Sequence, residues 1–115
     1  MPAKKIFTLT EARAQLPLVR ELTQQCHDDV EAIREEMTAE TNEARRAAME
    51  EKAEARLQEW SRGIMEIGAE PKGLWLVDFD SGDGFYFCWQ LGEDQIEYIH
   101  GYEAGYGGRR KISWT

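Results

Sequence analysis

Apolar residues in the first third of the chain recur every three or four positions, the spacing of one face of an α-helix. Thr8 and Glu11 precede this stripe and match a capping box, in which each side chain bonds the backbone N–H of the other residue. The stripe then runs through Leu9, Ala12, Leu16, Val19, Leu22, Cys26, Val30, Ile33 and Met37. The pattern predicts a helix over 8–37, kinked near Pro17 because proline removes a hydrogen bond inside a helix.

A second stripe with the same spacing predicts a helix over 43–67. Its apolar members are Ala44, Ala48, Met49, Ala53, Leu57, Trp60, Ile64 and Ile67. Gly68 follows directly and suits the left-handed position that ends a helix. Residues 38–42 carry no stripe, so we expect the chain to reverse there and form a long antiparallel hairpin resembling a two-stranded coiled coil.

After Pro71 the apolar period changes to two, which is typical of β-strands. Strands are predicted at Leu74–Phe79, Phe85–Trp89 and Ile96–His100, with short turn-forming segments between them. The chain is therefore predicted to be one α+β domain over 1–115. Its hairpin is followed by a three-stranded antiparallel β-meander over 73–100, then by a glycine-rich loop and basic tail over 101–115.

The chain is acidic, with 22 Asp and Glu against 14 Lys and Arg and a formal net charge of −8. Such a surface repels polyanions, so nucleic acid and anionic membranes are disfavoured as partners. No apolar signal region follows Met1–Lys5, and Cys26 and Cys88 lie far apart in the sequence. We therefore expect a cytoplasmic protein with reduced cysteines.

Several short segments carry a family resemblance. Residues 88–93 read Cys-Trp-Gln-Leu-Gly-Glu, His100 follows, and residues 104–109 read Ala-Gly-Tyr-Gly-Gly-Arg. Together with 7–13 and 16–19, they resemble the bacterial family called domain of unknown function 2203. The family pattern has tryptophan before the histidine, where this chain has Ile99. The resemblance implies a bacterial origin and the architecture above, but no activity.

His100 is the strongest candidate for chemistry. It ends the third predicted strand and leads into the glycine-rich loop, a setting in which scaffolds often present functional groups. A divalent metal ion or small ligand is one interpretation, with Asp78, Cys88, Tyr102 and Glu103 converging on it. The alternative is a structural histidine whose ring bonds the loop backbone.

The glycine-rich segment provides a second candidate. Gly107 and Gly108 could present backbone N–H groups beside Arg109 and Arg110, an arrangement suited to a phosphate or carboxylate. The segment matches no P-loop or Rossmann motif. The alternative is a flexible turn whose basic residues offset the acidity of the chain.

The hairpin is expected to be about 40 Å long, roughly twice the length of the strands. Its distal apolar residues, Val30, Ile33, Met37, Ala48 and Met49, then have no sheet to pack against. This favours a homodimer in which two hairpins form a four-helix bundle, the alternative being a two-stranded coil that needs no partner. Because no nucleophile has a partner base, we expect a non-catalytic interaction or regulatory module rather than an enzyme.

Overall fold

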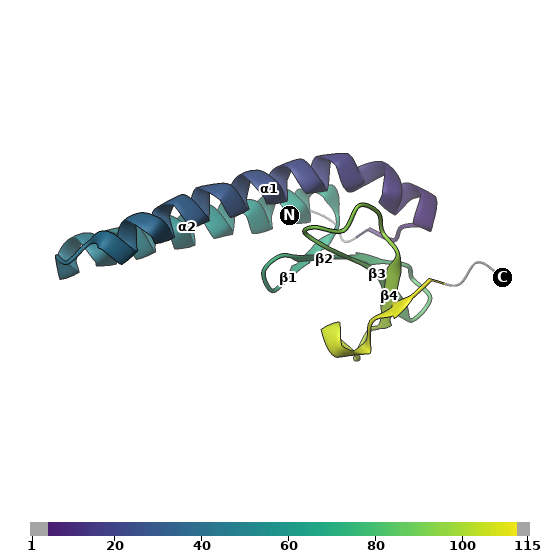
Figure 1. Cartoon of the computed structure of the whole chain (residues 1–115). Coiled ribbons are helices and arrows are strands. Elements are labelled where there is room, and N and C mark those ends of the chain that lie inside the picture. Colours follow the sequence, from purple (N-terminus) through teal and green to yellow (C-terminus); the bar gives the residue numbers. More distant parts are fainter. Residues whose placement is uncertain (1–4, 113–115) are drawn as a thin grey trace.

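The computed structural model describes residues 5–112, so residues 113–115 of the predicted tail lie outside the described residues. Helix α1 (Leu9–Ala39) begins after the predicted capping box. The backbone N–H of Glu11 donates to Thr8 Oγ1 (3.1 Å), and that of Thr8 donates to the Glu11 carboxylate (2.9 Å). The helix continues unbroken through Pro17, and its purple N-terminal part curves toward the sheet (Figure 1).

Helix α2 (Glu43–Ile67) returns antiparallel to α1 and completes the predicted hairpin. Its N-cap is Asn42, whose side-chain oxygen accepts a hydrogen bond from the Arg45 backbone N–H (3.0 Å). Gly68 ends the helix with φ 98°, a left-handed conformation that glycine adopts without steric cost. The predicted ranges 8–37 and 43–67 are close to the observed bounds.

The two apolar stripes face each other and form one half of the core. Thr23 is buried among them, and its hydroxyl accepts a hydrogen bond from the indole N–H of Trp60 (2.9 Å). Both polar groups are thus satisfied inside the hairpin. The buried apolar residues that the two helices contribute to this core are Ala12, Leu16, Val19, Cys26, Val30, Trp60 and Ile64.

The sheet has five antiparallel strands, so the prediction of three strands was wrong in number. In spatial order they are β1 (Glu70–Lys72), β2 (Leu76–Asp80), β3 (Phe85–Gln90), β4 (Tyr98–Gly101) and β5 (Arg110–Lys111). The three central strands correspond to the predicted meander. The additional strands are short, polar edge strands, and neither carries the apolar alternation that identifies a strand in a sequence. A proline in β1 and charges in β5 are tolerated at a sheet edge, where one side of the backbone is unpaired.

The two faces of the sheet differ in chemistry. Val77, Phe79, Phe87 and Trp89 are buried on the inner face and join the core of the hairpin. The alternating residues of β2, β3 and β4 point to the outer face. The yellow C-terminal segment, which includes the 3₁₀ turn η1 (Tyr106–Gly108), lies on this outer side, away from the helices (Figure 1).

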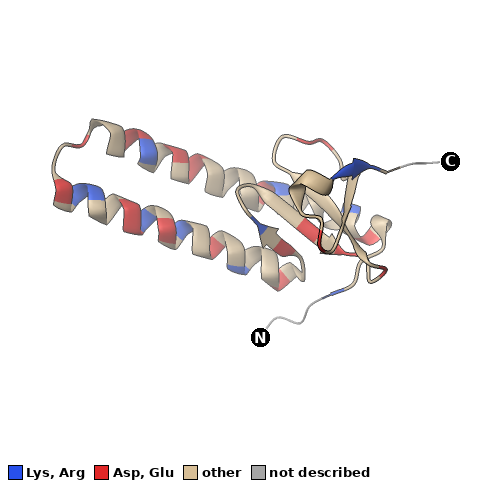
Figure 2. Cartoon of the chain, turned by 90° about the horizontal axis from the view of Figure 1, so that it is seen from below, with Lys and Arg blue, Asp and Glu red and all other residues tan. Residues whose placement is uncertain are grey.

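The hairpin projects well beyond the sheet, as its predicted length implied (Figure 1). The molecule measures 56 × 29 × 26 Å. Acidic and basic residues are interspersed along both helices (Figure 2). Within the described part of the chain, neither helix contains an apolar stretch that could cross a membrane.

Candidate metal centre

The register of the sheet brings three of the predicted site residues to one spot on the outer face. Asp78 of β2 pairs directly with Cys88 of β3, and Cys88 pairs with Tyr98 of β4. His100 follows Tyr98 by two residues, so its side chain points to the same face. Three neighbouring strands thus each contribute one side chain that can bind a metal.

The cluster is compact and buried. One potential ligand atom from each of Asp78, Cys88 and His100 lies within 4.8 Å of the other two. The exposed fractions of these residues are 2%, 1% and 4%, respectively. His100 Nε2 lies 2.9 Å from Asp78 Oδ2, and the Cys88 thiol also interacts with the Asp78 carboxylate, whose buried Oδ1 atom accepts no N–H or hydroxyl hydrogen bond within residues 5–112. A buried carboxylate oxygen without such a hydrogen bond is costly, and a bound cation would satisfy it.

The second ring nitrogen of His100 is oriented by the backbone. Nδ1 lies 2.9 Å from the carbonyl oxygen of Gly101, which can only accept, so Nδ1 carries a hydrogen. One further proton then lies between Nε2 and Asp78 Oδ2, on either the ring or the carboxyl group. Metal-binding histidines commonly donate their other N–H to a carbonyl in this way, which fixes the ring for coordination.

These contacts argue against Cys88 as a nucleophile activated by His100. Both ring nitrogens already have partners, so neither is available to accept the thiol proton. Burial, reinforced by the charge of Asp78, raises the pKa of Cys88 to about 12. The thiol therefore stays protonated near neutral pH unless a metal ion displaces the proton.

A small cavity of about 90 Å³ adjoins the cluster. All three residues line it, so an ion held by them would border a space that can admit water or a small molecule. The other lining residues are Lys72, Leu76, Tyr102, Gly105 and Tyr106. Of these, only Tyr102 was predicted from the sequence. Strand alternation could have identified Leu76, two residues before Asp78, whereas Gly105 and Tyr106 depend on the path of the loop.

One family model, described as an uncharacterised conserved protein (DUF2203), matches residues 5–112, nearly the whole chain. The chain belongs to the DUF2203 family. No curated protein and no solved structure matches it. The structure shows where the residues that suggested this DUF2203 assignment lie. Cys88 and His100 belong to the buried cluster described above, and the carbonyl of Glu93 accepts the indole N–H of Trp89 (2.9 Å).

The remaining predicted ligands of this DUF2203 protein lie further out. Tyr102 borders the cavity, and its hydroxyl donates to Asp80 Oδ1 (2.6 Å). Glu103 is exposed and is not among the residues that line the cavity. The glycine-rich loop turns Glu103 outward although it is close to His100 in sequence.

The predicted anion-binding residues span the end of η1 and the start of β5. Gly107 and Gly108 lie in η1, and the exposed Arg110 begins β5. Arg109 Nη2 donates to both carboxylate oxygens of Glu93, at 2.7 and 2.9 Å. Burial lowers the pKa of Arg109, but the bonds to Glu93 and the interaction with Cys88 together outweigh this and raise the pKa overall, so the guanidinium stays charged. An anion at this segment would have to compete with Glu93 for Arg109.

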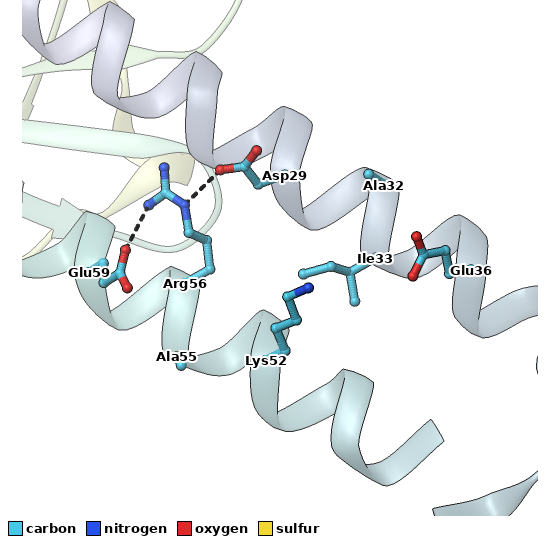
Figure 3. Close-up of a pocket in the computed structure, with 8 residues that line it drawn as sticks. All are labelled: Asp29, Ala32, Ile33, Glu36, Lys52, Ala55, Arg56 and Glu59. Carbon is cyan, nitrogen blue, oxygen red and sulfur yellow. Dashed lines mark hydrogen bonds and ion pairs between the residues drawn. The ribbon is translucent and has the colours of Figure 1, made fainter. Parts of the chain in front are cut away.

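A second hollow lies on the distal part of the hairpin. It has a volume of about 400 Å³ and opens between α1 and α2 on the side turned away from the sheet (Figure 3). An adjoining hollow of about 310 Å³ shares Ile33, Glu36 and Lys52 with it. We call the two together the hairpin groove; its lining is Asp29, Ala32, Ile33, Glu36, Arg45, Ala48, Met49, Lys52, Ala55, Arg56 and Glu59.

Proposed function

We propose that this protein binds one divalent transition-metal ion, with zinc as the best match, through Asp78, Cys88 and His100. The observation that carries the proposal is the close approach of three buried ligand atoms, all within 4.8 Å of one another. Carboxylate oxygen, thiolate sulfur and imidazole nitrogen are all established zinc ligands. The Asp78 Oδ1 atom, which accepts no N–H or hydroxyl hydrogen bond, and the hydrogen bond from His100 to Gly101 O support the same interpretation.

Zinc binding would require the three ligand atoms, now within 4.8 Å of one another, to shift. Zinc bonds of about 2.0–2.3 Å in tetrahedral geometry hold ligand atoms roughly 3.4–3.6 Å apart. The 2.9 Å contact between His100 and Asp78 would therefore open slightly, and the ion would replace the proton between them. Three protein ligands leave one position for water or a small molecule, and the adjoining cavity offers the space for it.

Zinc titration of the metal-free protein by calorimetry is expected to give one equivalent bound. Because the pKa of Cys88 is raised to about 12, binding near neutral pH must release the thiol proton. The apparent affinity should therefore rise by about tenfold for each pH unit between about pH 6 and 8 for this proton alone. Binding of less than about a tenth of an equivalent, measured by native mass spectrometry, would refute the proposal, as would an affinity that does not depend on pH.

We further propose that the protein is an interaction module that self-associates through its hairpin. What supports this second function is the projection of the distal hairpin beyond the sheet, with the hairpin groove open to solvent (Figures 1 and 3). Pairing of two hairpins would bury these surfaces in a four-helix bundle. Light scattering at tens of micromolar protein is expected to give the mass of a dimer, and a monomer mass would contradict the proposal.

A further inference from the structure

The charges along the hairpin groove differ between its two sides. The α1 side carries Asp29 and Glu36, whereas the α2 side carries Arg45, Lys52 and Arg56. Between them lies a floor of small and apolar side chains: Ala32, Ile33, Ala48, Met49 and Ala55. Only Glu59, at the end nearer the sheet, puts an acid on the α2 side.

We propose that a second copy of this chain occupies the hairpin groove, with α1 of each copy facing α2 of the other. This rests on the self-association proposed above and specifies its surface and arrangement. A groove that is acidic along one side and basic along the other is complementary to itself when rotated about a two-fold axis parallel to the helices. That rotation exchanges the sides, so each acidic side meets a basic one.

The positions along the helices agree with this arrangement. Asp29 and Arg56 lie at the same position along the hairpin axis, since Arg56 Nε donates to Asp29 Oδ2 at 2.8 Å (Figure 3). With a rise of about 1.5 Å per residue, Glu36 lies about 10 Å from Asp29 toward the hairpin tip. By the same rise, Lys52 and Arg45 lie about 6 and 16 Å from Arg56 in that direction. Glu36 would therefore sit between Lys52 and Arg45 of the second copy.

The other face-to-face arrangement is less favourable. A two-fold axis perpendicular to the helices would place α1 against α1 of the second copy. With that axis midway between Asp29 and Glu36, Asp29 would face Glu36 across the contact, and Lys52 would lie close to its own equivalent. Like charges that meet across an interface oppose association. Every helix has antiparallel neighbours in both arrangements, so the helix dipoles do not distinguish them and the side-chain charges decide.

A charge-exchange experiment tests the arrangement. Glu36→Lys puts a base opposite Arg45 and Lys52, whereas the double variant Arg45→Glu/Lys52→Glu puts two acids opposite Glu36. Each variant alone is expected to dimerise at least about tenfold more weakly than the wild type. An equimolar mixture should recover the dimer mass, because opposite charges then meet at both contacts.

Glu35→Lys is the matched control. It makes the same charge change one residue away, at an exposed position outside the groove, and should leave the dimer intact. Dimerisation that survives both groove variants would overturn this arrangement while leaving self-association standing. A monomeric wild type would overturn both. If both groove variants dimerise more weakly but their mixture does not recover the dimer, α1 of one copy does not face α2 of the other.

Discussion

His100→Ala is expected to weaken zinc binding by at least about a hundredfold, since even the loss of a residue that only orients a ligand costs up to about that factor. The substitution removes the only nitrogen ligand of the proposed set and leaves Asp78 and Cys88 alone. Calorimetric titration of wild type and variant under the same conditions measures the effect. Thermal unfolding with and without zinc gives a second readout, because an ion that binds only the folded state raises the melting temperature.

The metal-free variant should also be less stable, by about 1–3 kcal/mol, because a buried polar group loses its partner. Asp78 is only 2% exposed and depends on His100 for the hydrogen bond to Oδ2. If His100→Ala does not fold, Cys88→Ser provides a second variant of nearly unchanged size. It keeps the contact between His100 and Asp78 but lacks the sulfur ligand, so it should fold and bind zinc much more weakly.

His27→Ala is the matched control for His100→Ala. His27 lies on α1 with its ring edge-on to Trp75 (centroid distance 5.6 Å). Its loss should leave the zinc stoichiometry unchanged. Unaltered zinc affinity in His100→Ala would contradict the metal centre. If the wild type binds no zinc and His100→Ala is merely less stable, His100 is the structural histidine of the alternative interpretation.

The sequence predicted the hairpin well because its signals are local. A capping box, two apolar stripes and a glycine after the second stripe each act within one or two turns of helix. The edge strands Glu70–Lys72 and Arg110–Lys111 were missed for the opposite reason. They are held by backbone pairing to β2 and β4. Backbone pairing does not require an apolar side-chain pattern, so such short strands cannot be recognised in the sequence.

The candidate metal centre could be predicted in part. Strand alternation indicates that Cys88 points away from Phe87 and Trp89, and the short turns bring Asp78 and His100 onto neighbouring strands. What covers the outer face could not be deduced, because it depends on the path of the glycine-rich loop. Glu103 was expected near His100 because it follows closely in the sequence. The path of the loop instead leaves Glu103 exposed.

Arg109→Ala is expected to lower the free energy of unfolding by about 3 kcal/mol, the lower end of the range for breaking a buried ion pair by removing one partner, because this pair is partly buried. The Arg109 side chain is only 10% exposed, and Nη2 donates to both carboxylate oxygens of Glu93. Its guanidinium also lies 4.1 Å from the centre of the Tyr98 ring. The substitution leaves the carboxylate of Glu93 with only the backbone N–H of Gln90 (2.8 Å) among its described hydrogen bonds.

The loss should be visible in thermal unfolding followed by tryptophan fluorescence, as a melting temperature lower by more than about 10 °C. Arg110→Ala is the matched control, since it removes the same charge from the next residue. Arg110 is exposed in the edge strand β5, so its loss should change stability by no more than about 0.5 kcal/mol. If the two substitutions lower the free energy of unfolding equally, the contact between Arg109 and Glu93 does not stabilise the fold as expected.

The same pair of variants tests the predicted anion site. If phosphate binds at the glycine-rich segment through Arg109, it must displace Glu93, so millimolar phosphate should stabilise the wild type only weakly and Arg109→Ala not at all. If Arg110 and the backbone N–H groups suffice, phosphate should stabilise Arg109→Ala as much as the wild type, and Arg110→Ala should lose the effect. Without phosphate stabilisation of any of the three proteins, the segment has no anion site. Arg109 then acts only to tie the loop over the outer face to the turn between β3 and β4.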